Sequence, residues 1–150
     1  MFIKCQENIS DYSAIFREAV ENGDGVIQLE KGVYPIGATG ADRARYCISN
    51  NDPFEKSIAF HIKGKDGFTL LGNGATLLLK DMISAFGIAE SRNVTLRDCT
   101  IDYVGNKHFE LEIGKVEHNR VQVYKREGFD FDIVDGKIMY NGKQIVHALV

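Results

Sequence analysis

The sequence predicts a mainly β protein: a right-handed parallel β-helix with an N-terminal capping helix and an appended antiparallel β meander. Three observations predict it. A motif recurs with a period of about 26 residues, an amphipathic stretch precedes the first β-type runs, and after Tyr103 the pattern changes to strict alternation with tight-turn dipeptides. A fixed period of this length is typical of a solenoid, in which each unit buries its apolar face only against its neighbours.

The repeat consists of two copies, each with two short β-type runs separated by polar turns that contain Gly or Asn. Two pairs of motifs match: Phe60-x-Ile62 with Phe86-x-Ile88, and Phe68–Leu70 with Val94–Leu96. Short strands joined by glycine turns can resemble one another by chance. The matched residues keep the same order and spacing, however, and this favours a true repeat.

An earlier copy is expected upstream. Val26–Leu29 and Gly32–Tyr34 align with Phe68–Leu71 and Gly74–Thr76 at an offset of 42 residues, which is one period of 26 plus an insertion of 16. The polar stretch Gly37–Ser57 is the expected place of this insertion. Insertions in solenoids form loops on one face, which is often the binding face.

A helix is predicted over Asp11–Glu21. Its apolar residues share one face, at the spacings i, i+3, i+4, i+7 and i+8. Ser10 or Asp11 can accept hydrogen bonds from the first free amides, and Gly23 is expected to end the helix in the left-handed conformation. An amphipathic helix at this point can cover the open end of a solenoid core.

Short strands are expected to follow the helix. Their predicted ranges are Val26–Leu29, Val33–Ile36, Ala59–Ile62, Phe68–Leu71, Thr76–Leu79, Ala85–Ile88, Val94–Leu96 and Ile101–Tyr103. Strands this short, joined by tight turns, favour a parallel β-helix. A β-sandwich is the competing fold, but it would use longer strands joined by hairpins.

The pattern beyond Tyr103 indicates a second region. Apolar residues alternate with polar ones over Phe109–Ile113 and Phe129–Ile133, and Asp135-Gly136 and Asn141-Gly142 are typical dipeptides of antiparallel hairpins. We therefore expect a domain over residues 1–105 with the capping helix and first coils, and an antiparallel insert, a partial barrel, over residues 106–150. The apolar run that ends at Val150 indicates part of a larger protein.

Composition and net charge argue against several classes of function. A hydrophobic content of 44% and a charged content of 26% are ordinary for a globular protein. The net charge of −3, with Lys and Arg scattered, argues against nucleic acid as a partner, and no stretch has the length needed to span a membrane. No export signal is visible, and the three cysteines suggest buried thiols in a reducing compartment, so a cytoplasmic location is expected. No zinc spacing is present, and no metal or other cofactor is expected.

Four residues are candidates for substrate binding: Asn50, Asp52, Asp102 and Tyr103. Alternation along the strand places Asp102 on the face opposite Ile101 and Tyr103, where its carboxylate could meet a sugar hydroxyl. The alternative interpretation is that Asp102 is a solvated or turn-bonding carboxylate and that the polar loop around Asn50 is a plain solvated loop. Tyr103 and Tyr46 could stack on a sugar ring or simply pack at the rim of the core.

Several stretches resemble known proteins. Asp11–Val20 followed by Val26–Tyr34 resembles the opening of pectin-lyase-like right-handed β-helix proteins. Cys47–Asp52, Ile58–Phe60, Leu71–Ala75 and Asn93–Tyr103 resemble the exo-α-1,3-galactosidases of the glycoside hydrolases. The resemblance implies removal of terminal α-linked galactose with inversion, without a cofactor. It also implies a small inserted β-barrel at the place of Phe109–Gly142, and catalytic acids farther along the chain, so no catalytic residue is assigned here.

Two classes of function follow. The first is the N-terminal part of a glycoside hydrolase with a carbohydrate substrate, inactive by itself. The second is a non-catalytic solenoid module that binds glycan or mediates assembly. Its open β-helix end could pair with a second copy, since uncovered strand edges favour association. A polysaccharide lyase is a weaker third option, because lyases of this fold often use Ca²⁺ held by clustered carboxylates and no dense acidic cluster is present.

Overall fold

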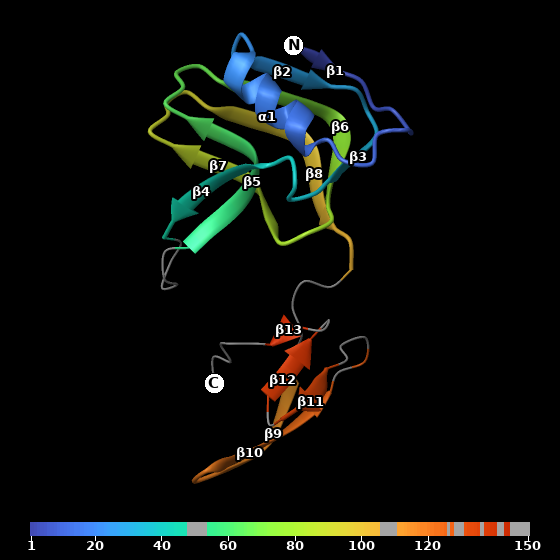
Figure 1. Ribbon diagram of the computed structural model, residues 1–150, viewed down its shortest axis with the longest axis vertical. Helices are drawn as coiled ribbons and strands as arrows, with labels where there is room; N and C mark the ends of the chain where they lie inside the picture. Colours follow the sequence, from blue (N-terminus) through green and yellow to red (C-terminus); the bar gives the residue numbers. More distant parts are fainter. Residues whose placement is uncertain are drawn as a thin grey trace. The chain divides into compact units, whose positions relative to one another are not determined.

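The computed structural model describes residues 1–47, 54–105, 111–125, 127, 131–135, 137–140 and 143–144. The chain divides into two compact units, Met1–Val104 and Gly105–Val150, which are described separately (Figure 1). The described residues are mainly strand, with one α-helix, so the mainly β class is confirmed. Within these ranges, no helix combines the length and apolar character needed to cross a membrane.

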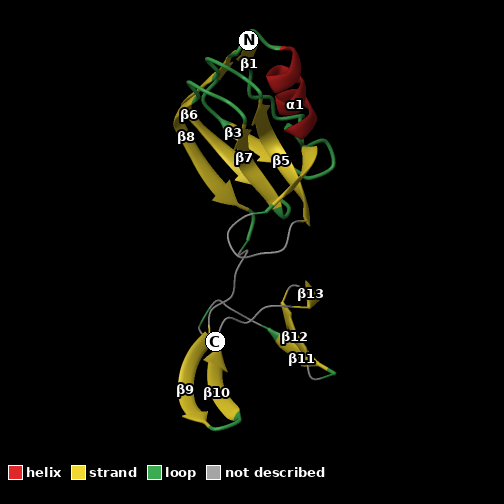
Figure 2. Ribbon diagram, turned by 90° about the vertical axis from the view of Figure 1, so that its left-hand side faces the viewer, coloured by secondary structure: helices red, strands yellow, loops and turns green. Residues whose placement is uncertain are grey.

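The first unit contains two sheets and the helix. One sheet consists of β1 (Phe2–Ile3), β2 (Val26–Leu29), β3 (Val33–Ile36), β6 (Thr69–Leu79) and β8 (Thr95–Tyr103). The other consists of β4 (Asp42–Tyr46), β5 (Phe54–Lys63) and β7 (Ile83–Ala89). The helix α1 (Ser13–Asn22) lies along one side of the unit (Figure 2).

Parallel pairing reproduces the repeat of the sequence. In the smaller sheet, Phe60 of β5 pairs with Phe86 of β7 and Ile62 pairs with Ile88. In the larger sheet, β6 pairs in parallel with β8: Thr69 lies opposite Thr95, an offset of 26 residues, and after a shift in register Thr76 lies opposite Thr100, an offset of 24. The period of about 26 residues is therefore the register in which successive strands stack.

The register of the earlier copy differs from the predicted offset of 42. Val26 pairs with Thr69 and Ile27 with Leu70, which is an offset of 43 residues. Ile27 and Leu70 are both fully buried. An offset of 42 would place Ile27 opposite Thr69, and a slip of one residue turns a whole strand face from the core to solvent. Burial of the apolar face therefore selects the register.

Four strands of the first unit are longer than predicted, and two are new. β5 and β7 extend beyond the predicted ranges Ala59–Ile62 and Ala85–Ile88 at both ends. β6 and β8 each join two predicted strands into one, because the backbone passes through a bulge between Leu71 and Ala75 without leaving the sheet. β1 was not predicted. β4 lies inside the stretch Gly37–Ser57, which was expected to be a loop, and it pairs antiparallel with the first half of β5.

The prediction for the start of α1 is confirmed for Asp11, whereas the prediction for its end is wrong. Asp11, one of the two predicted caps, accepts hydrogen bonds from the N–H groups of Ser13 and Gly37, both at 2.9 Å. Gly23 is extended at φ −75°, so the predicted left-handed end is wrong. Glycine is required there because a Cβ would lie 2.3 Å from the carbonyl oxygen of Ala19.

An aromatic cluster joins α1 to both sheets. The ring of Phe16 stacks on Phe60 of β5 with centroids 4.4 Å apart, and the ring of Tyr12 meets the edge of Tyr34 of β3 at 4.7 Å. All four side chains are fully buried. Burying each such ring contributes about 1.5–3 kcal/mol, so the helix stabilises the unit by covering its core.

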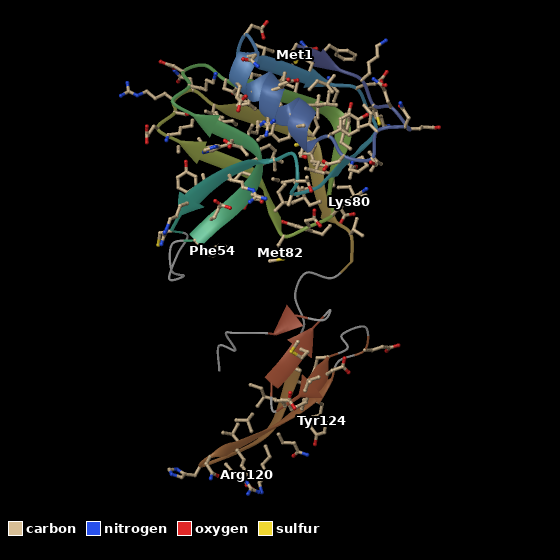
Figure 3. All side chains as sticks on the ribbon, viewed as in Figure 1. Met1, Phe54, Lys80, Met82, Arg120 and Tyr124 are labelled. Atoms are coloured by element: carbon tan, nitrogen blue, oxygen red, sulfur yellow. The ribbon has the colours of Figure 1, made fainter. Side chains whose placement is uncertain are left out.

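The second unit is antiparallel in its described residues. β9 (Leu111–Glu117) and β10 (Arg120–Lys125) form a hairpin, and a separate sheet consists of β11 (Asp132–Val134), β12 (Lys137–Tyr140) and β13 (Lys143–Gln144). Side chains of the hairpin, among them Arg120 and Tyr124, are exposed (Figure 3). Phe109, Phe129 and the Asn141-Gly142 turn lie outside the described residues.

Candidate functional site

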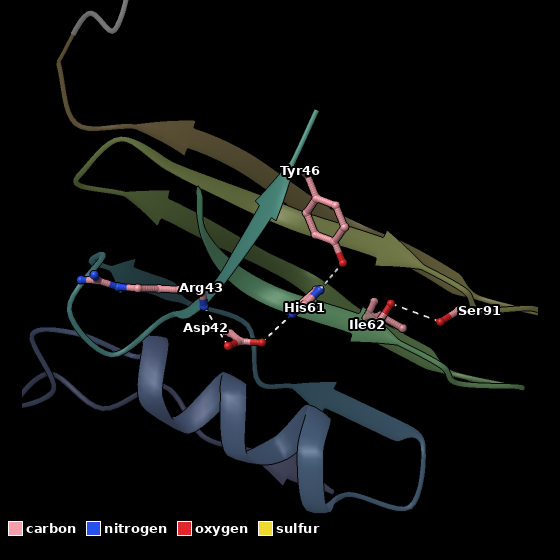
Figure 4. Close-up of polar contacts among 6 residues, drawn as sticks. All are labelled: Asp42, Arg43, Tyr46, His61, Ile62 and Ser91. Atoms are coloured by element: carbon pink, nitrogen blue, oxygen red, sulfur yellow. Dashed lines mark hydrogen bonds and ion pairs between the residues drawn. The ribbon is translucent and has the colours of Figure 1, made fainter. Parts of the chain in front are cut away.

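Three polar side chains form a hydrogen-bonded relay on the smaller sheet. Asp42 and Tyr46 are four residues apart on β4, and strand alternation places them on the same face. His61 of β5 lies between them: its Nδ1 is 2.5 Å from Oδ2 of Asp42, and its Nε2 is 2.8 Å from the hydroxyl of Tyr46 (Figure 4). The antiparallel pairing of β4 with β5 therefore joins the three groups.

The carboxylate fixes the direction of one of the two hydrogen bonds. A carboxylate only accepts hydrogen bonds, so Nδ1 of His61 donates to Asp42. When the ring is neutral, Nε2 is then the acceptor for the hydroxyl of Tyr46. The His61 side chain is only 9% exposed, whereas that of Asp42 is 38% exposed. The hydroxyl of Tyr46 is therefore linked by hydrogen bonds, through the nearly buried imidazole of His61, to the partly exposed carboxylate of Asp42.

Electrostatics keep Asp42 ionised. Partial burial by itself would raise the pKa of Asp42, but the hydrogen bonds from His61 and from the backbone N–H of Arg43 outweigh it, with a further contribution from the charge of Arg17. The pKa of Asp42 is therefore lower than its ordinary value. Arg43 itself turns outward to an exposed ion pair with Glu55 at 3.1 Å.

A pocket of about 300 Å³ lies on the same sheet, with Tyr46 in its lining. The lining mixes apolar and polar groups: Ile58, Phe86, Gly87 and Ile88 with Tyr46, Cys47, Lys56 and Ser84. The ammonium of Lys56 donates to the carbonyl oxygen of Tyr46 at 2.9 Å and lies 3.3 Å from the centroid of the Phe54 ring. Cys47 is exposed, so the expectation of a buried thiol is wrong there.

The predicted site residues do not gather at this pocket. Asp102 and Tyr103 are exposed at the end of β8, in the larger sheet. Oδ1 of Asp102 accepts the backbone N–H of Tyr103 at 2.7 Å, a local bond of the kind that the turn-bonding alternative describes. Asn50 and Asp52 lie outside the described residues.

His61 is the residue that sequence reasoning missed. A signal existed, because a lone histidine stands in the apolar run Ala59–Ile62 and must find a partner when its strand is buried. That partner, Asp42, lies in a stretch that was expected to be a loop. In the described part of the chain, no group of three or more His, Cys, Asp or Glu side chains could hold a metal ion.

Comparison with known proteins points to one class of enzyme. No protein-family model matches the chain. α-1,3-Galactosidase A of Bacteroides fragilis is 26% identical over 141 residues, which cover 90% of this chain and 23% of the relative. α-1,3-Galactosidase B of Phocaeicola vulgatus is 31% identical over 102 residues, covering 67% of this chain and 16% of the relative. α-1,3-Galactosidase B of Akkermansia muciniphila is 22% identical over 123 residues, with coverages of 81% and 16%.

These similarities support a galactosidase-like family. The chain spans less than a quarter of the length of the curated relatives that it matches.

Proposed function

We propose that the chain is the N-terminal part of a glycoside hydrolase that removes terminal α-linked galactose with inversion. In this proposal the first unit is the helix-capped start of a right-handed parallel β-helix, and the second unit is an antiparallel insert. The observation that supports it most is the similarity to α-1,3-galactosidases over 90% of the chain. The parallel stacking at the period of the repeat agrees with it.

The catalytic acids are not assigned to this chain. An inverting hydrolase needs one carboxylic acid to protonate the leaving oxygen and one carboxylate to activate water, about 6.5–9.5 Å apart. We propose that this chain contributes substrate contacts, through Asp102 and Tyr103 at the end of β8 and through Asn50 and Asp52. The exposed carboxylate of Asp102 keeps oxygen lone pairs available beyond its bond to Tyr103.

The test is turnover by the complete protein. It should release galactose from a terminal α-1,3-galactoside, and proton NMR should detect β-galactose as the first product. Asp102→Asn should raise KM by roughly tenfold through a weakened contact to a sugar hydroxyl. Asp98→Asn is the matched control, since Asp98 is exposed on the same strand at φ 60°, which asparagine tolerates, and KM should stay unchanged.

A folded complete protein that hydrolyses no α-galactoside would contradict the proposal. A non-catalytic glycan-binding or assembly module is the second candidate. It is favoured by apolar side chains left exposed on β7 and β8, Ile88 at 52% and Ile101 at 45%. In that case the complete protein would bind sugar or a second copy and show no turnover.

A further inference from the structure

The pocket beside the relay has the chemistry of a sugar site. We propose that this pocket binds a single neutral sugar ring, and that His61 and Asp42 act as positioning residues that hold Tyr46 in place as one wall. The choice of a galactosyl ring rests on the proposed function. The inference goes beyond that function by placing a binding site on the smaller sheet, apart from Asp102 and Tyr103.

The size and lining of the pocket fit one ring. A volume of about 300 Å³ is at the lower end for small-molecule pockets, which combine an apolar lining with a few placed polar groups. A pyranose has an apolar face and a rim of hydroxyl groups. Phe86 and Ile88 can meet the face, while Lys56 and Ser84 can meet the rim.

Two polar groups of the lining keep unused bonding capacity. An ammonium has three N–H donors, and Lys56 gives one to the carbonyl of Tyr46, leaving others for a ligand. Among the described residues, none is hydrogen-bonded to the hydroxyl of Ser84, which is half-buried on β7. A ligand hydroxyl can therefore bind both without breaking an existing contact.

The relay explains how Tyr46 is held in place as a lining residue of the pocket. Its hydroxyl is tied to Nε2 of His61 at 2.8 Å, and its ring meets the imidazole edge-on with centroids 5.7 Å apart. A side chain that is already immobilised loses less entropy when a ligand binds. The nearly buried His61 and the ionised Asp42 thus order the pocket before the ligand arrives.

The first experiment is a titration of the 150-residue chain with methyl α-galactoside, followed by amide NMR. Shifts should concentrate at Lys56, Ser84 and Gly87 and be absent from the β9–β10 hairpin. Lys56→Met should weaken binding by roughly tenfold, since a hydrogen bond to a charged group is lost. Lys63→Met is the matched control, an exposed lysine on the same strand outside the pocket, and it should leave binding unchanged.

A double-mutant cycle on Tyr46 and His61 tests whether the two residues act together in the relay. Tyr46→Phe keeps the ring and removes the hydroxyl, and His61→Gln removes the imidazole. Each should weaken binding, and the double variant should be no weaker than the worse single variant, because both break the same link. Additive losses in folded variants would show that the two residues act independently and would overturn the positioning role.

The outcomes separate this inference from the proposed function. Shifts away from the pocket, or equal effects of Lys56→Met and Lys63→Met, would overturn the pocket even if the complete protein hydrolyses galactosides. Binding in the pocket combined with no turnover by the complete protein would support the pocket and contradict the hydrolase.

Discussion

Asp11 ties the start of α1 to the turn that follows β3. Its Oδ1 accepts from the backbone N–H groups of Ser13 and Gly37. Partial burial would raise the pKa of Asp11, but these two bonds outweigh it and hold the pKa below its ordinary value. One carboxylate therefore satisfies two backbone donors from segments far apart in the sequence.

Asp11→Ala should lower the free energy of unfolding by about 1–2 kcal/mol at neutral pH, measured by urea denaturation. Because the folded-state pKa is depressed, the contribution of Asp11 is fully present above its unfolded pKa of about 3.9 and is lost as pH falls through the lower folded value. The gap between variant and wild type should therefore narrow in acid.

Glu18→Ala is the control for this prediction, since Glu18 is exposed in the middle of α1 and alanine favours helix. It should leave stability within about 0.5 kcal/mol of wild type. A gap for Asp11→Ala that stays constant from neutral to acidic pH would show that its effect does not come from the ionised carboxylate.

β6 and β8 approach each other closely at the bulge. A Cβ on Gly72 would lie 2.5 Å from the carbonyl oxygen of Asp98 and 2.6 Å from the Cβ of Cys99. The backbone of β8 cannot move away without breaking its parallel pairing with β6. β6 and β8 can therefore continue side by side through the bulge only because residue 72 is glycine.

Gly72→Ala should lower the free energy of unfolding by about 1–3 kcal/mol, the usual cost of overpacking. Gly64→Asn is the control: Gly64 has φ +63° with nothing within 4 Å of an added Cβ, and asparagine tolerates that conformation. Its effect should be small. Equal stability of Gly72→Ala and wild type in thermal unfolding would refute the close approach.

Local patterns predicted some elements well. β2 and β3 have the predicted bounds, because each is an apolar run between turn residues. β4 was missed because Asp42–Tyr46 is mostly polar, and its strand form depends on pairing with β5, a contact across the chain. The same long-range pairing creates the relay, so no local pattern could join His61 to Asp42. The only local sign in the sequence is that His61 is a single polar residue within the apolar run Ala59–Ile62.

At the scale of the first unit, one edge of the larger sheet is uncovered. β8 is an edge strand, and Ile101 on it is 45% exposed. Leu77 of β6, the residue that pairs with Ile101, is fully buried. This apolar column of the core therefore continues to a surface that a further strand beside β8 would cover.

We expect the 150-residue chain to self-associate through this surface, with an apparent mass in sedimentation equilibrium that rises with concentration. Ile101→Lys should reduce the association. Ile113→Lys is the control, an isoleucine of similar exposure, 55%, on β9 of the second unit. An Ile113→Lys variant that dissociates as fully as Ile101→Lys would place the contact elsewhere.

The central claim is that this chain supplies the first coils of a longer parallel β-helix. A crystal structure of the complete protein tests it most directly. We expect a later strand to pair in parallel with β8 and to bury Ile101. An edge of β8 that stays in solvent, or that pairs with an antiparallel strand, would contradict the claim.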